Sequence, residues 1–418
     1  MSPLRFLRRR FVPPIRRAII RGHRRRGSLL ISDTTLRDGE QMPGATLSPN
    51  DKVAIARELA AIGVHSIDAG FAAASRQDTD AIRRIAAAVD GPVITSLART
   101  LPSDIDAADA ALEGLPLQRR GVSLFIGTSP IHRRHKLGKS RSETLKLAID
   151  AVRHAAERFS VVSLAAEDSS RTEPDFLAEL AREAIAAGIS SLGLPDTVGV
   201  QTPEQVREQL RRLQDDVPQL GSVMLAVHTH NDLGLAVANA LAAIEEGATI
   251  VQGTFGGIGE RAGNLPLEEL LLAVATHPEQ YGPLEGIDLT RLRPACRLIA
   301  ERTGLPIAGH KPVVGRNVFA TAAGIHQDGL LKNPETYLPY PMDWLGVDEI
   351  EMVLGRHSGA AAVAHRLQAI GCDNDDAVVR GVLDRIKSLP KSEHATDDQL
   401  RDWSEAIART SAATSSAE

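Results

Sequence analysis

Between residue 28 and about residue 280, short aliphatic runs alternate with longer segments in which apolar residues recur every three or four positions. The longer segments, clearest over 50–63, 142–159 and 233–247, have the period of amphipathic helices. Helix-capping residues stand at several of their beginnings (Ser48, Ser142, Thr202), and glycines stand at several of their ends (Gly63, Gly188, Gly247). The aliphatic runs are typical of strands buried on both faces. They cover 29–35, 65–71, 92–98, 121–127, 161–167, 190–196, 223–229 and 249–255.

Eight strands, each followed by a helix, over roughly 250 residues match the count of a (β/α)8 barrel. The competing architecture is a doubly wound parallel sheet, whose first strand is followed by a glycine-rich phosphate-binding turn. The residues after 29–35 do not contain that glycine pattern. The sequence therefore predicts an α/β protein in which residues 28–280 form a TIM-barrel catalytic domain.

Three further segments flank this predicted barrel. Residues 1–27 are arginine-rich, with ten arginines and no acidic residue in the first 26, and we expect a disordered extension. Such a block can contact nucleic acid, but the acidic remainder of the chain argues against a nucleic-acid-binding protein. Residues 281–346 include a Gly- and Pro-rich stretch with little periodicity, which favours a linker that contacts a partner. Residues 347–418 are expected to form a small, mostly helical C-terminal subdomain.

The composition limits the core chemistry and the cellular compartment. Hydrophobic residues make up 43% of the chain and aromatic residues 3%, so the core must be aliphatic. Two cysteines, Cys296 and Cys372, cannot form a disulfide framework, which fits a reducing, cytoplasmic setting. No run of 18 uncharged apolar residues exists, so no association with a membrane is expected.

Candidate chemistry gathers at the predicted strand ends, which is where TIM barrels place catalytic groups. His228 and His230 end the seventh strand two residues apart, so both imidazoles point to the same side. Asp38 follows the first strand, and two histidines with one carboxylate form a plausible divalent-metal triad with open positions. Other strand ends carry further polar residues, each of which taken alone is compatible with a surface charge or a cap: Arg37, Glu40, Glu167, Asp168, Asp196 and Thr197.

Five motifs resemble the signatures of the 2-isopropylmalate synthase and homocitrate synthase family. In chain order they read DTTLRDGEQMPG, GLPDTVGVQTPEQ, HTHNDLGLAVANALAAIEEGA, GGIGERAGNLPLEEL and GIHQDGLLKNPETY, and the match spans about residues 29–372. The resemblance implies a metal-dependent condensation of acetyl-CoA, as co-substrate, with a 2-oxo acid in a homodimer. It implies the metal ligands Asp38, His228, His230 and Asn264. The identity of the divalent cation (Mn, Mg, Zn or Co) stays open.

The same resemblance implies roles for further residues. Arg37 and Thr197 would meet the 2-oxo acid, and His326 and Tyr337 would complete the site from the partner subunit. In chemical terms, the metal makes the keto carbon electrophilic and a base removes a methyl proton from the acetyl thioester. Arg37 and the metal stabilise the alkoxide, and water hydrolyses the thioester. We predict that His326, oriented by Glu167, is the base.

Several positions depart from the family pattern. Relatives usually carry histidine where this chain has Ser123, and often serine where it has Ala165; the strand-2 glutamate is Asp68 and a following proline is Ala72. We expect Ser123 and Ala165 to line the 2-oxo acid pocket. The Ser123 hydroxyl would then favour a substrate with a polar or anionic side arm over one with an isopropyl group.

These departures leave alternatives to a 2-isopropylmalate or homocitrate synthase open. The first is a variant enzyme that uses an unusual anionic 2-oxo acid, such as a phosphorus-bearing oxaloacetate analogue, in secondary metabolism. A hydroxyacyl-CoA lyase of the same superfamily and a non-catalytic regulator are the others. Leucine feedback is doubtful, because only about 45 residues follow Cys372.

Overall fold

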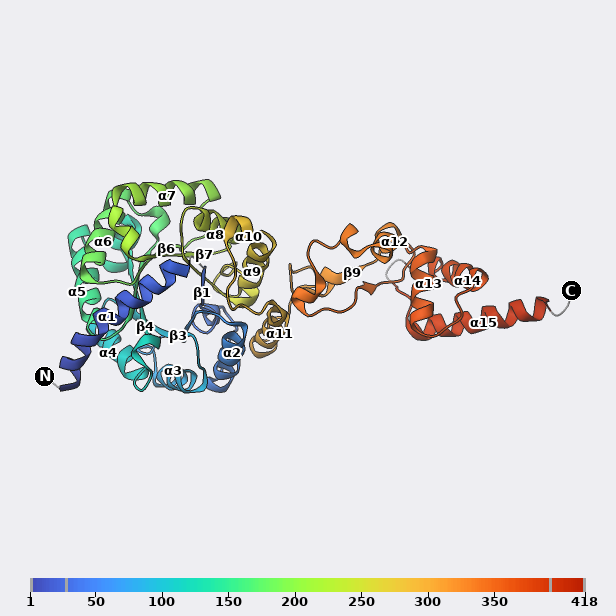
Figure 1. The fold of residues 1–418 in the computed structure, drawn as a ribbon, viewed down its shortest axis with the longest axis horizontal. Helices are drawn as coiled ribbons and strands as arrows, with labels where there is room; N and C mark the ends of the chain where they lie inside the picture. Colours follow the sequence, from blue (N-terminus) through green and yellow to red (C-terminus); the bar gives the residue numbers. More distant parts are fainter. Residues whose placement is uncertain (1–2, 27–28, 391–392, 416–418) are drawn as a thin grey trace. The chain divides into compact units, whose positions relative to one another are not determined.

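The computed structural model describes residues 3–26, 29–390 and 393–415, and its centre is a closed barrel of eight parallel strands. Each strand pairs with the next in sequence, and β8 pairs with β1 to close the ring (Figure 1). All eight predicted runs contain a strand, so the TIM-barrel prediction is confirmed. The strands are β1 (Leu30–Asp33), β2 (Ser66–Asp68), β3 (Val93–Arg99), β4 (Arg120–Gly127), β5 (Val161–Glu167), β6 (Ser191–Asp196), β7 (Met224–Thr229) and β8 (Ile250–Gly253).

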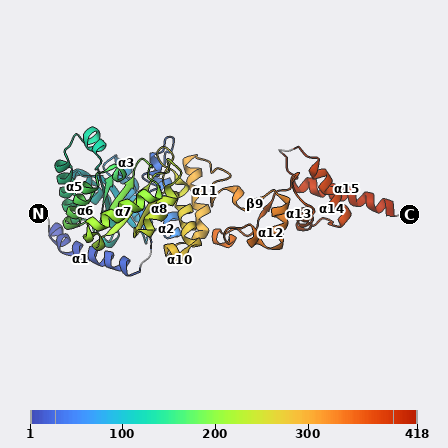
Figure 2. The same ribbon diagram turned by 90° about the horizontal axis from the view of Figure 1, so that it is seen from above.

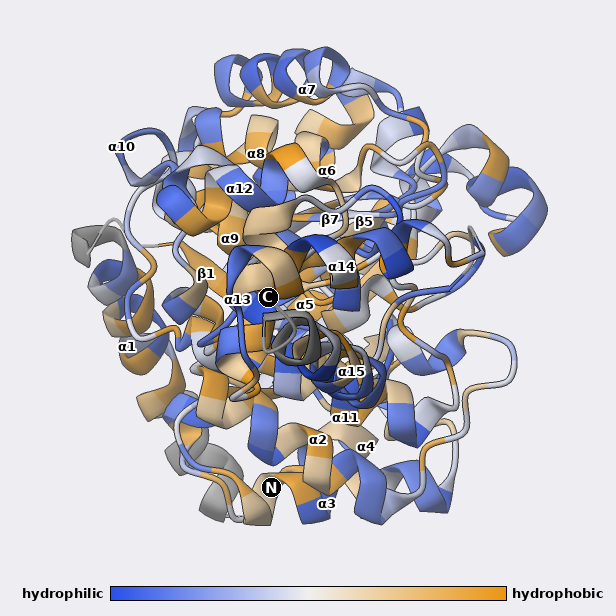
Figure 3. Ribbon diagram, turned by 90° about the vertical axis from the view of Figure 1, so that its right-hand side faces the viewer, coloured by the Kyte–Doolittle hydropathy of each residue, from blue (hydrophilic) through white to orange (hydrophobic). Residues whose placement is uncertain are grey.

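Most helices of the outer layer bury one apolar face against the barrel. On α7, Val206, Leu210 and Leu213 are buried, and Figure 3 shows hydrophobic and hydrophilic stretches alternating along this helix. Ser48 and Thr202 form capping boxes, as their positions predict, but Ser140 rather than Ser142 caps α5. The helices are α2 (Pro49–Ile62), α3 (Arg76–Ala88), α4 (Pro102–Ala111), α5 (Arg141–Ala156), α6 (Pro174–Ala187), α7 (Pro203–Asp216), α8 (Ala236–Glu245), α9 (Leu267–Thr276), α10 (Pro278–Tyr281) and α11 (Leu292–Thr303).

The arginine-rich segment differs from the expected disordered extension, because it forms helix α1 (Pro3–Arg26). This helix lies across one end of the barrel in Figures 1 and 2. Ile20 packs with Leu30 and Met224 at the beginnings of β1 and β7. The buried Arg16 guanidinium donates to the backbone oxygens of Ala156 (2.8 Å) and Phe159 (2.7 Å). Composition suggested disorder, but apolar residues at helical spacing between the arginines give α1 a face that the barrel buries.

Residues 308–418 form a second compact unit, and residues 1–307 form the first. The boundary therefore falls later than the predicted end of the barrel domain, because α11 buries Leu292, Cys296 and Ile299 within the first unit. The second unit has its own aliphatic core. It contains a two-stranded parallel sheet and four helices: β9 (Ala320–Thr321), β10 (Glu351–Met352), α12 (Gly324–Lys332), α13 (Ala360–Ala369), α14 (Asp376–Lys387) and α15 (Asp397–Ser415). Along the described chain, no helix has both the length and the apolar character that a membrane crossing requires.

Candidate metal centre

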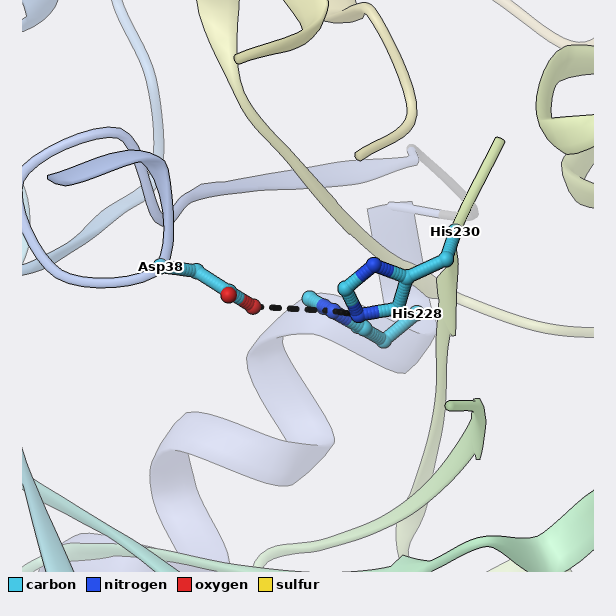
Figure 4. Close-up of side chains that lie close together, drawn as sticks. All are labelled: Asp38, His228 and His230. Atoms are coloured by element: carbon cyan, nitrogen blue, oxygen red, sulfur yellow. Dashed lines mark hydrogen bonds and ion pairs between the residues drawn. The ribbon is translucent and has the colours of Figure 1, made fainter. Parts of the chain in front are cut away.

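Asp38, His228 and His230 converge at the carboxyl end of the barrel. The two histidines come from the end of β7 and the residue after it, and Asp38 reaches them from the turn that follows β1 (Figure 4). The Nε2 atoms of the two imidazoles are 3.3 Å apart, and Asp38 Oδ2 lies 3.1 Å from His228 Nε2. The candidate ligand atoms all lie within 4.8 Å of one another. The structure thus brings together the three residues that the sequence predicted.

The charge states of these groups suit a cation. Burial, followed by the neighbouring His228, lowers the pKa of His230 to about 4, so this imidazole is neutral at pH 7. Burial acts to raise the pKa of Asp38, but Arg37 and His228 outweigh it and hold that pKa well below its usual range. Neutral imidazoles and an ionised carboxylate are the forms that bind divalent metals.

The spacing of the nitrogens also fits one shared ion. Two nitrogens that are each about 2.0–2.1 Å from a metal lie roughly 2.8–3.4 Å apart at octahedral or tetrahedral angles. The observed Nε2–Nε2 distance falls in that range. Asn264 is bridged to His230 through the backbone, and its side-chain nitrogen donates to the Ile258 carbonyl (3.1 Å). Its Oδ1 is buried and has no hydrogen-bond partner among the described residues. The donor set of this site therefore fits a divalent cation.

Arg37 lies beside the triad and links it to a second buried carboxylate. Its Nη1 is 3.2 Å from Asp38 Oδ2, and its Nε donates to Asp68 Oδ2 at 2.8 Å. Asp68 occupies the end of β2 and is 3% exposed, and burial raises its pKa. The two carboxylates fix the guanidinium from two sides, so Arg37 is positioned before any ligand enters.

A cavity of about 350 Å³ opens onto the triad. Its polar lining includes Thr197, Glu167 and Lys136, and Glu167 pairs with Lys136 at 2.6 Å. The Thr197 hydroxyl accepts a hydrogen bond from the Asp168 amide (2.9 Å). Successive strands supply an apolar wall, made of Leu97, Phe125, Ala165, Gly193 and Pro195.

Two cations that line this cavity were not predicted from the sequence. Lys136 comes from a π-helical turn, His132–Leu137, after β4, and Arg261 comes from the loop after β8, where it pairs with Asp232 (2.8 Å). The basic run HRRHKL was a visible signal for the first, and GGIGERAG contained the second. Neither run shows by itself which of its cations faces the barrel axis.

Three of the acidic residues at strand ends bind other groups of the chain and do not line this cavity. Glu40 pairs with Lys52 (2.5 Å), Asp168 pairs with Arg171 (2.8 Å), and Asp196 accepts from the Gln201 amide (3.0 Å). These contacts match the alternative given above, in which an acidic residue at a strand end is a surface charge or a cap and not part of the active site.

Ser123 does not line the cavity at the triad, contrary to the sequence-based expectation. It lines a separate cavity nearer the beginnings of the strands, and Phe125, two residues later on β4, lines the cavity at the triad. Both positions face the barrel interior, but they belong to different layers of it. The polar side arm inferred from Ser123 therefore loses its structural basis.

His326 and Tyr337 belong to the second unit and lie together there. His326 is on α12, and its ring centroid is 4.3 Å from that of Tyr337, with the ring planes inclined by 33°. Tyr337 is 46% exposed. The orientation of His326 by Glu167 stays a prediction, since the partners of Glu167 in the described chain are Lys136 and His132.

Comparison with known proteins places this architecture and site in a family. Residues 313–394 match the homocitrate synthase post-HMGL domain-like family. The chain is 44% identical over 374 residues to a 2-isopropylmalate synthase of Methylacidiphilum infernorum, covering 89% of this chain and 74% of that protein. It is 43% identical to the 2-isopropylmalate synthase of Gloeobacter violaceus, covering 88% and 71%.

Solved structures share the barrel. An HMG-CoA lyase of Bacillus subtilis superposes with a TM-score of 0.58 at 22% identity, over 67% of this chain and 95% of that one. The carboxyl transferase domain of Rhizobium etli pyruvate carboxylase gives 0.53 at 17% identity, over 69% and 50%. These two likenesses concern the fold alone. Residues 28–299 match the HMGL-like family over most of the barrel unit, and the chain belongs to that family.

Proposed function

We propose that the protein condenses acetyl-CoA with a 2-oxo acid and water to give a 2-substituted malate and free CoA. The observation that carries this proposal is the Asp38–His228–His230 cluster with Arg37 at its side, at the mouth of the barrel. The 2-isopropylmalate synthases at 40–44% identity support the same reaction.

The residues divide the chemistry among them. A divalent cation held by Asp38, His228 and His230, with Asn264 beside them, would polarise the keto group of the 2-oxo acid. Arg37, held by Asp68, donates to the oxygen on which negative charge develops as the new carbon–carbon bond forms. The Thr197 hydroxyl, which lines the cavity, is available to the substrate carboxylate.

A base must take a methyl proton from the acetyl thioester so that its carbon can attack. We assign this step to His326, with Tyr337 beside it, and the second unit of a partner subunit would bring both to the barrel. Water then cleaves the thioester, and the sulfur leaves as the CoA thiol.

The lining of the cavity favours an apolar side arm on the 2-oxo acid. Leu97, Phe125 and Ala165 form a wall without hydrogen-bonding side chains. The cations of the lining already pair with carboxylates: Lys136 with Glu167, Arg261 with Asp232, and Arg37 with Asp38 and Asp68. An anionic arm would have to compete for them, whereas an isopropyl group gains by leaving water. We therefore propose 2-oxoisovalerate over the phosphorus-bearing alternatives.

The test is CoA release, detected with a thiol reagent, from acetyl-CoA and each member of a panel of 2-oxo acids. We expect 2-oxoisovalerate to give the highest kcat/KM among 2-oxoisovalerate, 2-oxoglutarate, pyruvate, oxaloacetate and phosphonopyruvate. A tenfold preference for oxaloacetate or phosphonopyruvate would overturn the side-arm proposal. Cleavage of a hydroxyacyl-CoA without condensation activity would overturn the reaction itself.

We also propose that the enzyme is a cytoplasmic homodimer whose sites are completed in trans. Ile325 is 81% exposed and Tyr337 46% exposed, so the face around His326 presents apolar surface. Mixing inactive His326→Ala and Arg37→Ala subunits should recover activity, since one site of each heterodimer is then intact. Absence of recovery after verified subunit exchange would count against shared sites.

Metal titration of the chelated enzyme with Mn²⁺, Mg²⁺, Zn²⁺ and Co²⁺ identifies the preferred cation.

A further inference from the structure

The interior of the barrel is hollow below the metal centre. TIM barrels usually fill this space with layers of bulky branched side chains. Here a cavity of about 430 Å³ lies among the beginnings of the strands, under α1. That volume falls in the range of roughly 300–1,000 Å³ typical of small-molecule sites.

The residues around this cavity are stacked in layers. The first inward positions of four strands are aliphatic, Leu30, Val93, Val161 and Ile250. Two residues later, the same strands present polar side chains, Ser32, Thr95, Ser163 and Gln252. Two residues later again, Leu97 and Ala165 line the cavity at the triad. A polar layer thus lies between two apolar ones.

The strand register places six members of the polar lining in two arcs on either side of the barrel. Ser123 is aligned with Ser163, and Ser163 with Ser191, across β4, β5 and β6. On the other side of the barrel, Ser32 is aligned with both Ser66 and Gln252. Aligned residues on neighbouring strands face the same side of a sheet, and all of these line the cavity.

Most of these polar side chains have no partners in the part of the chain that the structure describes, and Thr95, which donates to the Ile67 carbonyl, is an exception. The side chains of Ser32, Ser123, Ser163, Ser191 and Gln252 make no hydrogen bond to any described residue. Ser32 is 5% exposed and Ser191 2% exposed. Their polar atoms open onto the cavity rather than being sealed in the protein, so water or another occupant of the cavity can supply the missing hydrogen bonds.

We propose that this lower cavity binds a small neutral amphiphile, such as an aliphatic diol. Its hydroxyl end would contact these serines, and its aliphatic end would lie among Leu30, Val161 and Met224 beneath α1. A neutral occupant suits the lining, whose ionisable side chains among the described residues are Glu285, His23 and His65, with no lysine or arginine. Because Gln252 lines both cavities, the occupant would contact a side chain that also faces the catalytic site.

Methionine methyl NMR of the full chain tests this proposal with 1,2-hexanediol as the probe. The chain has five methionines, and Met224, which lines the lower cavity and is 4% exposed, reports on its occupancy. We expect a saturable shift of the Met224 methyl signal, assigned with Met224→Leu, while the signals of Met42 and Met352 stay unchanged. No shift, or a non-saturating drift of all the signals, would show that the cavity holds water alone and would overturn the proposal.

Two neighbours on β5 provide matched variants. Ser163→Leu fills the lower cavity and should abolish the Met224 shift, whereas Ala165→Leu, which fills the upper cavity, should leave it intact. Loss of the shift in Ala165→Leu as well would overturn the placement. Ser163→Ala removes one hydroxyl without adding bulk, and it keeps the test valid if the leucine variant fails to fold. It should weaken binding by about 2- to 12-fold.

Discussion

The pairing of Arg37 with Asp68 predicts that replacing a residue which touches no substrate will slow catalysis. In Asp68→Asn, an amide oxygen would replace the carboxylate that accepts from Arg37 Nε at 2.8 Å. Hydrogen bonds to charged groups are worth about 1.5–3 kcal/mol and neutral ones about 0.5–1.5, so the variant loses about 1–1.5 kcal/mol of restraint on Arg37. If that restraint serves the transition state, kcat falls about 5- to 13-fold.

The assay is steady-state CoA release with 2-oxoisovalerate, alongside thermal unfolding. Asp33→Asn is the matched control, since Asp33 is also a buried acid at a strand end but binds Thr35 rather than Arg37. We expect Asp68→Asn to lower kcat with KM nearly unchanged, and Asp33→Asn to leave both as they are. A change confined to KM, or an equal loss of kcat in the two variants, would refute the positioning of Arg37 by Asp68.

Asp33, Arg16, the metal centre and Phe125 each give a further testable outcome. Burial raises the pKa of Asp33 from 3.8 to about 7, so the folded state keeps a proton that the unfolded state releases between those pH values. The free energy of unfolding should therefore fall by about 4 kcal/mol as pH rises through this window. Urea titrations of Asp33→Asn should lack that fall. Arg16→Met loses two hydrogen bonds and should cost about 2–4 kcal/mol by urea unfolding, whereas the exposed Arg17→Met should stay within about 0.5 kcal/mol. Chelation should abolish CoA release and added metal restore it, but His228→Ala should stay inactive with an unchanged circular dichroism spectrum; full activity after chelation would contradict the metal role. Phe125→Ala should shift kcat/KM toward 2-oxo acids with bulkier apolar arms by about 10-fold or more, and an unchanged ranking would mean that Phe125 does not contact the arm.

The barrel could be predicted from the sequence because its signal is local and repeated. Each strand is an aliphatic run, and parallel strands covered on both faces need such runs. The metal triad was predictable for a related reason, since all parallel strands end on the same side of the barrel. Residues after β1 and at the end of β7 therefore had to meet, whatever the details of packing.

Depth within the barrel could not be predicted in the same way. The alternation along β4 correctly places Ser123 and Phe125 on the inner face, but it does not say at which level each lies. That level depends on the tilt and stagger of the strands, which are properties of the closed ring. The role of α1 was missed for a similar reason, because its partners Ala156 and Phe159 are distant in sequence.

The separation in sequence between Arg16 and its partners affects the order of events during synthesis. Arg16 leaves the ribosome 140 residues before Ala156, whose carbonyl it binds. At about 5–20 residues per second, the helix segment waits roughly 7–28 seconds for that part of its docking site to be made. The first element of the chain to be translated thus completes its contacts only when β7 is made, because its Ile20 packs with Met224. A growing chain stalled before Phe159 would expose the apolar face of this segment to chaperones, and one stalled after β7 would no longer do so.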